Sequence, residues 1–212
     1  MKKVFIVGGD GFARECYNHL SVMKSYDPSV EFGGFLGHGG YGHTVDYKHL
    51  QKFYLGEESD HVFKDDEYAV IGAGYPELRR KIYNDLKKRD VRFLNIICTP
   101  LDPSVCCGEA NIFVPPFFGS VNLTIGNGNV FNSNVIVGHD TEIGDFNFFG
   151  PRSSVLGTVK IGNDNIIGTN AVILPHAKIG NNNKVAPLSA VYKGCRHNCY
   201  MLGNPALKVG EI

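Results

Sequence analysis

The pair His139-Asp140 combines two residue types that handle protons together near neutral pH. A histidine with its ordinary pKa of about 6.5 can accept a proton from an amine or a hydroxyl that attacks an electrophile. A carboxylate beside it can orient the imidazole and stabilise its protonated form. Contact between adjacent residues requires a turn, because neighbouring side chains of a strand point to opposite faces. We interpret His139 as a candidate general base and Asp140 as its orienting partner.

A strict period of six residues surrounds this pair. Apolar residues recur at every sixth position, and small or polar residues recur four places after many of them. This period fits neither an amphipathic helix nor simple strand alternation, and it is typical of a parallel β-helix. Each hexad then forms one face of a prism with its apolar residue inward, and three hexads form a coil of about 18 residues. The apolar series is Ile125, Phe131, Val137, Ile143, Phe149, Val155, Ile161, Ile167, Ile173, Ile179, Val185 and Val191.

One such coil separates His139 from Gly157, so the two residues should be neighbours along one corner of the prism. His139 comes two places after the inward Val137, which puts it at or near a corner where it can project outward. A carbonyl group under attack needs backbone N–H donors for its developing negative charge. Gly157 is the candidate donor, and an ordinary turn glycine is the alternative interpretation.

The first hundred residues follow a different pattern. Short runs rich in β-branched residues alternate with glycine turns and helical stretches, which predicts a small parallel, Rossmann-like α/β sheet. We expect this domain to span 1–100 and a left-handed parallel β-helix to span 101–212. The expected strands are Lys3–Val7, Val30–Leu36, Tyr68–Ile71 and Val91–Ile97, and the expected helices are Phe12–Lys24, with an apolar stripe of Phe12, Cys16, Leu20 and Met23, and Glu77–Arg89.

Two glycine-rich turns of this domain are candidates for binding a substrate. The first opens a helix, whose N-terminal amides suit a phosphate. A complete dinucleotide fingerprint needs a third glycine where the chain has Arg14, so this turn fits the diphosphate of a nucleotide sugar better than NAD or FAD. The alternative is that the glycines merely permit tight turns. The candidates are Gly8, Gly9, Asp10 and Gly11 in the first turn and Gly72, Ala73 and Gly74 in the second.

Composition argues against several classes of function. The 212 residues carry 21 basic and 21 acidic side chains, so no net basic field favours nucleic acid or a membrane surface. We expect neither a transmembrane helix nor a signal peptide, because the apolar runs are too short. The six cysteines show no pairing frame and no usual zinc spacing, so we expect a reduced, cytoplasmic protein without a metal.

Four motifs together carry a family resemblance. With them the chain resembles the bacterial sugar acetyltransferases of the hexapeptide superfamily, the sialic-acid O-acetyltransferase and nucleotide-aminosugar N-acetyltransferase relatives that carry a small N-terminal α/β domain. The resemblance covers nearly the whole chain. It implies that the N-terminal domain holds a nucleotide-linked amino sugar, with UDP or dTDP as the nucleotide, and that homotrimers of the β-helix bind acetyl-CoA between subunits. The motifs are VGGDGFARE at 7–15, VIGAG at 70–74 with LRRKI at 78–82, GHD at 138–140 with IGDF at 143–146, and GNPA at 203–206.

The resemblance also assigns the base to His139 and the donor to the acetyl carbonyl to the Gly157 N–H. Two departures from the family pattern stand out. Phe148 occupies the place of a second histidine that some relatives have, and Gly37-His38-Gly39-Gly40 replaces an acidic pair that would meet the nucleoside. Acetyl-CoA should lie along the coil edge as far as its C-terminal end. The candidates for binding it are Gly157, Gly168, Ala186, Lys193, Asn204 and Pro205.

We therefore expect an acetyl-CoA-dependent N-acetyltransferase acting on a nucleotide-linked amino sugar for surface-glycan or glycoprotein-sugar synthesis. O-acetylation of a sugar hydroxyl and a non-catalytic sugar-binding scaffold remain as alternatives. A zinc-dependent hydratase of the carbonic-anhydrase type needs three converging histidines. His139 and His176 are one residue out of register with two full coils, so they do not stack.

Overall fold

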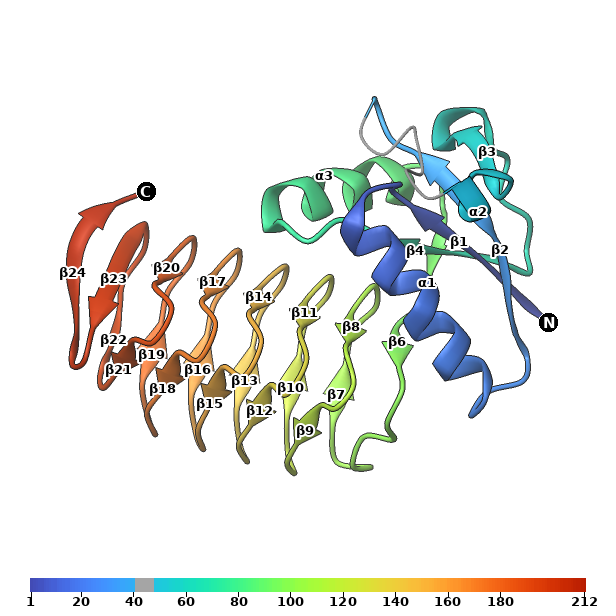
Figure 1. Ribbon diagram of the computed structural model, residues 1–212. Helices are drawn as coiled ribbons and strands as arrows, with labels where there is room; N and C mark the ends of the chain where they lie inside the picture. Colours follow the sequence, from blue (N-terminus) through green and yellow to red (C-terminus); the bar gives the residue numbers. More distant parts are fainter. Residues whose placement is uncertain (41–47) are drawn as a thin grey trace. The chain divides into compact units, whose positions relative to one another are not determined.

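The computed structural model describes residues 1–40 and 48–212, and the chain divides into two units, Met1–Cys98 and Thr99–Ile212 (Figure 1). Both units are built mainly on parallel strands, but the first alternates them with helices and the second coils them. Within the described ranges, no helix has the length and apolar character needed to cross a membrane.

The first unit holds a five-stranded sheet in the order β3-β2-β1-β4-β5. All of its pairings are parallel. The chain moves outward from β1 in one direction and then returns to the other side with β4. Ligands of doubly wound sheets bind at such a switch point, at the carboxyl ends of the strands. The strands are β1 (Lys2–Val7), β2 (Val30–Gly37), β3 (Tyr54–Glu57), β4 (Glu67–Ile71) and β5 (Arg92–Phe93), and β6 (Ile96–Ile97) follows them.

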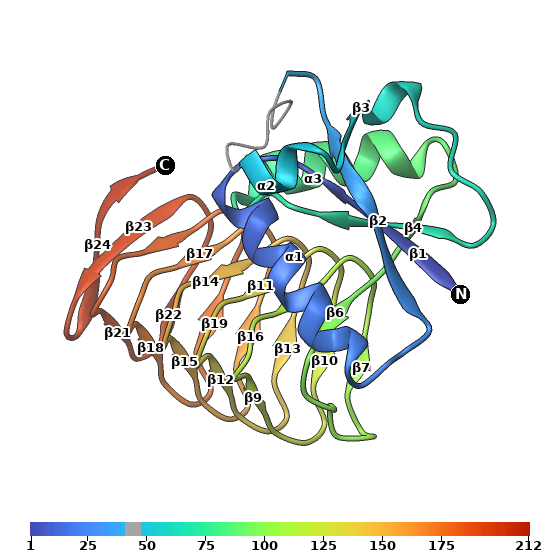
Figure 2. The ribbon, with the colours of Figure 1, turned by 45° about the vertical axis from the view of Figure 1, so that its right-hand side comes forward.

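Helix α1 (Gly11–Lys24) packs on β2 and β1 through one apolar stripe, and Figure 2 shows it running along one face of the sheet. Burial of Cys16, Leu20 and Met23 confirms most of the predicted stripe. Phe12 was wrongly included, because it is only half-buried and Ala13 takes the buried position in the first turn. The other helical segments are α2 (Lys48–Gln51), the 3₁₀ turn η1 (Glu58–Asp60) and α3 (Pro76–Lys87).

The sequence patterns failed at the edges of this sheet. The expected strand Val91–Ile97 is wrong as a single element, because its residues form two separate two-residue strands, β5 and β6. The edge strand β3 and helix α2 were not predicted at all. Both edge strands are short, and β3 contains Gly56, which weakens the local strand signal. These strands therefore form because β2 and β4 offer partners for β3 and β5, and not because of a strand pattern in their own sequence.

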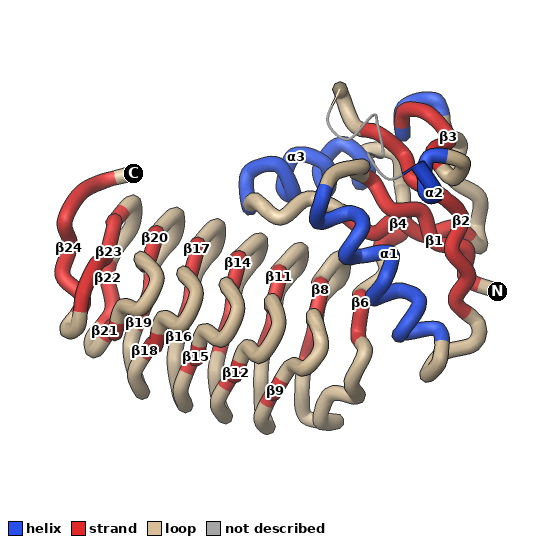
Figure 3. Tube along the Cα trace, viewed as in Figure 1, coloured by secondary structure: helices blue, strands red, loops and turns tan. Residues whose placement is uncertain are grey.

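The second unit is a left-handed parallel β-helix of three sheets. Its strands are two residues long except for β23 and β24 at the end of the chain. Figure 3 shows the short strands separated by loops. Strands pair with a register of 18 residues, as in Ile143 with Ile161. We call the sheet of Glu142, Lys160 and Lys178 the charged face. It contains β7 (Cys106–Cys107), β10 (Thr124–Ile125), β13 (Glu142–Ile143), β16 (Lys160–Ile161), β19 (Lys178–Ile179) and β22 (Gly194–Cys195).

The other two sheets are more apolar on their outward side. We call the sheet with outward Phe118, Ile136 and Val172 the apolar face. It contains β9 (Phe118–Gly119), β12 (Ile136–Val137), β15 (Ser154–Val155), β18 (Val172–Ile173) and β21 (Ala190–Val191). The third face includes β8 (Ile112–Phe113), β11 (Val130–Phe131), β14 (Phe148–Phe149), β17 (Ile166–Ile167), β20 (Lys184–Val185), β23 (Cys199–Gly203) and the antiparallel β24 (Ala206–Glu211).

The interior of the prism confirms the six-residue prediction. Each of the twelve apolar residues of the series is at most 4% exposed. Phe113, Phe131 and Phe149 stack with ring centroids 4.8 Å apart, the spacing of neighbouring strands. A buried ladder of asparagines satisfies the polar groups of one corner. Each Oδ1 accepts a hydrogen bond from the backbone N–H of the next asparagine, and the last accepts one from the Cys199 N–H. Its members are Asn111, Asn129, Asn147, Asn165 and Asn183.

The corners of the prism repeat one backbone conformation. A residue with positive φ recurs every six places, and Asn and Asp, which tolerate this region, occupy many of these positions. Asp140 is one of them, with φ of 57°, and Thr158 is the next residue in its column, with φ of 63°. The Thr158 N–H donates to the His139 carbonyl at 2.8 Å, which links the two coils at this corner.

Candidate functional site

His139 and Asp140 form a hydrogen-bonded pair at the corner between the apolar face and the charged face. His139 Nδ1 lies 2.7 Å from Asp140 Oδ2, and the positive φ of Asp140 provides the turn that adjacent residues need for this contact. An ionised carboxylate only accepts hydrogen bonds, so Nδ1 carries the proton and Nε2 keeps its lone pair. The geometry therefore gives His139 the tautomer that a general base requires.

Asp140 is held in its charged form by two donors. The His139 imidazole and then Asn122 Nδ2, which lies 3.2 Å away on the preceding coil, lower the pKa of Asp140 below its usual value. The side chains of His139 and Asp140 are 59% and 51% exposed in the single chain. A substrate can therefore approach the pair directly, but this chain alone does not shield it from water.

Gly157 lies directly beside the imidazole ring. A Cβ at this position would lie 2.7 Å from His139 Nε2 and 2.8 Å from Cε1, closer than real side-chain carbons come. Glycine is thus required for the ring to lie over this corner, a role that the 18-residue spacing did not reveal. The Gly157 N–H donates to no acceptor in the described parts of the chain, whereas its carbonyl accepts from the His176 N–H.

Thr141 secures the same corner from inside. Its hydroxyl lies 3.2 Å from the Leu156 carbonyl, to which it donates, and 3.4 Å from the Val159 nitrogen, from which it accepts. Thr141 is fully buried, so these bonds are shielded from water. Sequence reasoning gave Thr141 no role, although it is one of the polar residues that follow an inward residue by four places. It links the coil of His139 to the coil of Gly157 at their shared corner.

The candidates for binding acetyl-CoA divide between two edges of the apolar face. Lys193 connects β21 to β22 and so lies on the edge of His139 and Gly157. Gly168 and Ala186 connect strands of the third face to strands of the apolar face, and they stack on the opposite edge.

The remaining coenzyme candidates, Asn204 and Pro205, lie in the turn between β23 and β24. The Gly203 N–H donates to Ser189 Oγ at 3.0 Å, which places this turn beside the edge of Gly168 and Ala186. A single chain therefore does not bring all six coenzyme candidates together.

The two glycine turns of the first unit meet at the switch point of its sheet. A Cβ on Gly8, whose φ is 134°, would lie 2.9 Å from the Gly72 carbonyl oxygen. The Gly72 N–H donates to the Val7 carbonyl at 2.9 Å, and the Gly8 N–H donates to the Leu36 carbonyl at 2.7 Å. The turns are thus close-packed backbone at the carboxyl ends of β1 and β4. The structure brings the two predicted substrate turns together.

Arg79, near the start of α3, binds the backbone of the second glycine turn. Its side chain is buried, and Nη1 donates to the Ile71 carbonyl at 2.6 Å and to the Ala73 carbonyl at 2.7 Å. Burial lowers the pKa of this guanidinium to about 10, so it remains charged at neutral pH. Sequence reasoning quoted Arg79 within a motif but gave it no role, because nothing in the local pattern separates a buried arginine from an exposed one.

The described residues contain no group of three or more His, Cys, Asp or Glu side chains that could hold a metal ion. His176 has φ of 66° and follows Thr158 in the column of Asp140. It is therefore a turn residue in a different column from His139, as the register predicted.

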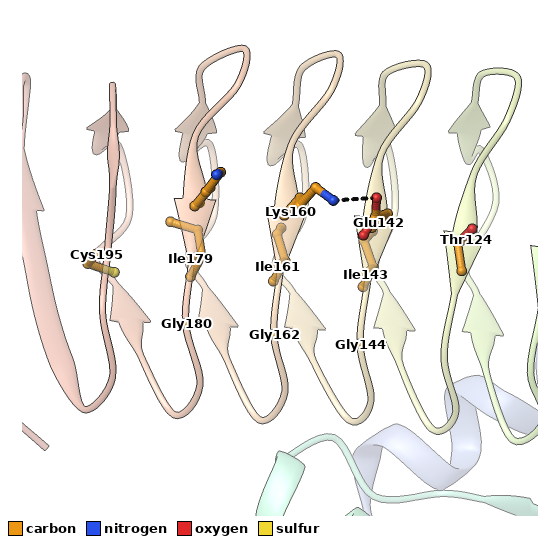
Figure 4. A pocket seen from close by; sticks show the side chains of 11 residues that line it. Thr124, Glu142, Ile143, Gly144, Lys160, Ile161, Gly162, Ile179, Gly180 and Cys195 are labelled. Carbon is orange, nitrogen blue, oxygen red and sulfur yellow. Dashed lines mark hydrogen bonds and ion pairs between the residues drawn. The ribbon is translucent and has the colours of Figure 1, made fainter.

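A groove of about 510 Å³ lies on the charged face (Figure 4). Its walls include Glu142 and Lys160, whose side chains form an ion pair at 2.7 Å, and Lys178 on the next coil. Neither His139 nor Gly157 lines this groove. An exposed ion pair contributes little to stability, so the pair is a feature of the solvated surface.

Comparisons with known proteins agree with this architecture. The family described as bacterial transferase hexapeptide (six repeats) matches residues 158–193. No curated protein sequence matches the chain. Among solved structures, a variant of the perosamine N-acetyltransferase from Caulobacter crescentus, in complex with CoA and GDP-perosamine, is similar with a TM-score of 0.86 and 20% identity. That match covers 100% of this chain and 98% of that chain.

Two further structures are similar over almost the full length. The acetyltransferase domain of PglB from Neisseria gonorrhoeae, in complex with acetyl coenzyme A, has a TM-score of 0.84 at 15% identity and covers 98% of this chain and 99% of that chain. WeeI from Acinetobacter baumannii has a TM-score of 0.81 at 22% identity and covers 99% and 100%. At these identities the likeness establishes the fold, an α/β unit followed by a left-handed β-helix.

Proposed function

We propose that this protein is an acetyl-CoA-dependent N-acetyltransferase that acts on the amino group of a nucleotide-linked amino sugar. The observation that carries the proposal is the corner in which His139 Nε2, with its lone pair free, lies over Gly157. Two of the similar structures hold CoA or acetyl coenzyme A, and one of them also holds GDP-perosamine. Those ligands support the proposed substrate classes for this chain.

The proposed reaction is direct transfer. The neutral amine attacks the thioester carbonyl carbon, and His139 Nε2 takes the proton that the amine loses. Asp140 stabilises the imidazolium that results. The Gly157 N–H donates to the carbonyl oxygen as negative charge develops there. When the C–S bond breaks, the imidazolium returns its proton to the departing sulfur, which leaves an amide and free CoA thiol.

The first unit is proposed to bind the nucleotide sugar at its switch point. Gly8 to Gly11 form the turn that leads into α1, where a diphosphate is favoured by the helix terminus. The Gly8 N–H is already bonded to the Leu36 carbonyl, so the amides proposed to meet the diphosphate are those of Gly9 and Gly11. The second turn adjoins the first, because Gly72 packs against Gly8, and it is proposed to border the same ligand. Residues 1–100 would thus hold the acetyl acceptor, the nucleotide-linked amino sugar, and residues 101–212 would hold the acetyl donor, in the cytoplasm, for surface-glycan or glycoprotein-sugar synthesis.

A homotrimer is proposed because one chain leaves the site incomplete. Phe118 and Ile136, on the outward side of the apolar face, are 56% and 44% exposed, and apolar surface of this kind favours a partner. A neighbouring copy packed against this face could bring its Gly168 edge toward the His139 edge. Acetyl-CoA between the two copies would then contact both sets of predicted residues, and the neighbour would shield His139 from water.

The proposal is tested by thiol release from acetyl-CoA with a panel of UDP-, GDP- and dTDP-linked amino sugars. We expect release with at least one sugar and a loss of about 10²–10⁴-fold in kcat/KM for His139→Ala, the range of general-base catalysis. His176→Ala is the matched control, an exposed histidine of the same corner, and should retain activity. Release that is unchanged in His139→Ala, or absent with every sugar, would contradict the proposal.

A further inference from the structure

A bulge in β3 changes the direction of Glu57 at the carboxyl edge of the first unit's sheet. Phe35 of β2 pairs with Tyr54, but Gly37 pairs with Glu57, so three steps along β3 match two along β2. Gly56, with φ of 108°, absorbs the extra residue. Bulges redirect side chains in this way. Glu57 consequently points to the same face of the sheet as Tyr54.

Glu57 and Tyr54 meet over the bare backbone of Gly37. A Cβ on Gly37 would lie 2.9 Å from Tyr54 Oη and would collide with Glu57 Oε1. Tyr54 Oη donates to Glu57 Oε1 at 3.4 Å. Burial, and then the negative charge of Glu57, raise the pKa of Tyr54, so its hydroxyl keeps its proton. The Glu57 carboxylate therefore lies at the end of β2, against the backbone of Gly37 and hydrogen-bonded to the Tyr54 hydroxyl.

This pair lies on the face of the sheet that α1 covers. Phe35, two residues before Gly37 and hence on the same face, packs on Tyr17 of α1 with ring centroids 6.0 Å apart. His38 points to the opposite face, where its Nε2 lies 3.6 Å from Asp85 of α3. The first glycine turn adjoins the end of β2, because the Gly8 N–H donates to the Leu36 carbonyl.

In doubly wound sheets the turn after the first strand binds phosphate, and a carboxylate at the end of the second strand accepts hydrogen bonds from the ribose. In this chain β2 ends without an acidic residue, and the bulge in β3 supplies a carboxylate to the same place. An ionised carboxylate offers only acceptors, and the two ribose hydroxyls offer the matching donors.

We propose that Glu57, with Tyr54 as its positioning residue, binds the 2′- and 3′-hydroxyls of the substrate's ribose. This inference rests on the proposed function, and it narrows the substrate class to sugars linked to ribonucleoside diphosphates. A dTDP-sugar lacks the 2′-hydroxyl and would leave one acceptor of Glu57 without its donor. Polar sites of this kind discriminate strongly against a ligand that lacks the hydrogen-bonding group.

The test compares two matched pairs of probes by calorimetry on the full chain, GDP against 2′-deoxy-GDP and UDP against 2′-deoxy-UDP. Whichever base binds more tightly, we expect the ribonucleotide to bind about tenfold or more tightly than its deoxy partner. Glu57→Gln should weaken ribonucleotide binding and remove that difference. Equal affinities in the wild type, a difference that persists in Glu57→Gln, or no binding by any of the four probes would overturn the proposal.

Further variants separate the ribose site from a folding defect. Gly37→Ala keeps the carboxylate but displaces it, so it should abolish the ribose preference as Glu57→Gln does. Glu31→Gln removes an exposed carboxylate near the other end of β2 and should retain the preference. Thiol release is measured in parallel. Release without a ribose preference overturns only the ribose site, whereas no release with any amino sugar overturns the proposed function.

Discussion

The β-helix and the α/β unit assemble their candidate residues by different routes. In the β-helix, His139 and Gly157 are neighbours because each coil repeats the preceding one after 18 residues. The same register stacks the apolar residues of the interior. In the α/β unit, Gly8 and Gly72 are far apart in sequence and meet because of the order of the strands. A contact within a repeat can thus be predicted from the separation of two residues in the sequence. A contact within the α/β sheet can be predicted only when the order of the strands is known.

The two regions also differ in how their candidate residues are covered. The side chain of His139 is more than half exposed, and its reactive nitrogen is bordered by the backbone of the next coil. The turn of Gly72 and Ala73 is buried and rests on the fully buried Arg79. Substitutions at the corner should therefore change activity with little change in stability. Substitutions below the glycine turns should change stability and binding together.

Among the substitutions that compare the two units, the largest expected effect is that of Gly157→Ala on activity. The added methyl group would displace the His139 imidazole and crowd the N–H proposed to face the carbonyl oxygen. Loss of one such donor costs about 10²–10³-fold in kcat, so we expect at least that loss, measured by thiol release.

The unfolding midpoint of Gly157→Ala should stay close to that of the wild type, because the crowded neighbour is an exposed ring. Gly210→Ala is the control, since a Cβ there meets no atom within 4 Å. Full activity in Gly157→Ala would show that neither the ring position nor the N–H matters.

The opposite pattern is expected for Arg79→Met. This change removes the donor to the Ile71 and Ala73 carbonyls, and each buried acceptor left without a partner costs about 1–3 kcal/mol. Chemical denaturation should show that loss. KM for the nucleotide sugar should rise more than kcat falls, because the turn that Arg79 supports is proposed to bind substrate.

Arg80→Met provides the matched control for Arg79→Met on the same helix, since Arg80 is not fully buried. An unchanged KM in a folded Arg79→Met protein would separate the glycine turn from substrate binding. A loss confined to kcat would contradict the contrast between the two units.

The sequence predicts the positions of residues in the β-helix better than it predicts those in the α/β unit. The inward series, the corner position of His139 and its neighbour Gly157 depend on a local period, and the structure places them as the period predicts. The edge strand Tyr54–Glu57 has no such period, so the sequence does not predict its bulge or the direction of the Glu57 carboxylate. Arg79 was missed for a related reason, because burial of a charge depends on partners supplied by a distant turn.

The coenzyme candidates lie on two different edges, which residue spacing does not determine. Gly168 and Lys193 each suit a coil edge, but spacing alone does not say which edge, because the edge follows from the strands that each residue connects. The six-residue period defines three equivalent corners for every coil. Only the assignment of strands to sheets separates the corner of His139 from the corner of Ala186.

The smallest expected effect concerns the pH dependence of the corner. The His139 imidazole and then Asn122 lower the pKa of Asp140, so the folded state holds the charged carboxylate more strongly than the unfolded state does. Stability from this source is present above the unfolded value near 3.8 and is lost as the pH falls through the lower folded value. Asp140→Asn should therefore be less stable than the wild type at pH 7, and the difference should shrink below pH 3.8.

This prediction is checked by thermal melts of wild type and Asp140→Asn at several pH values. Asparagine tolerates the positive φ at this position, so the backbone of the turn is kept. A double-mutant cycle with His139→Ala isolates the pair, since the effect of Asp140→Asn should become smaller once the imidazole is gone. A stability difference that is independent of pH and of His139 would mean that the turn conformation, rather than the charged pair, accounts for the contribution of Asp140.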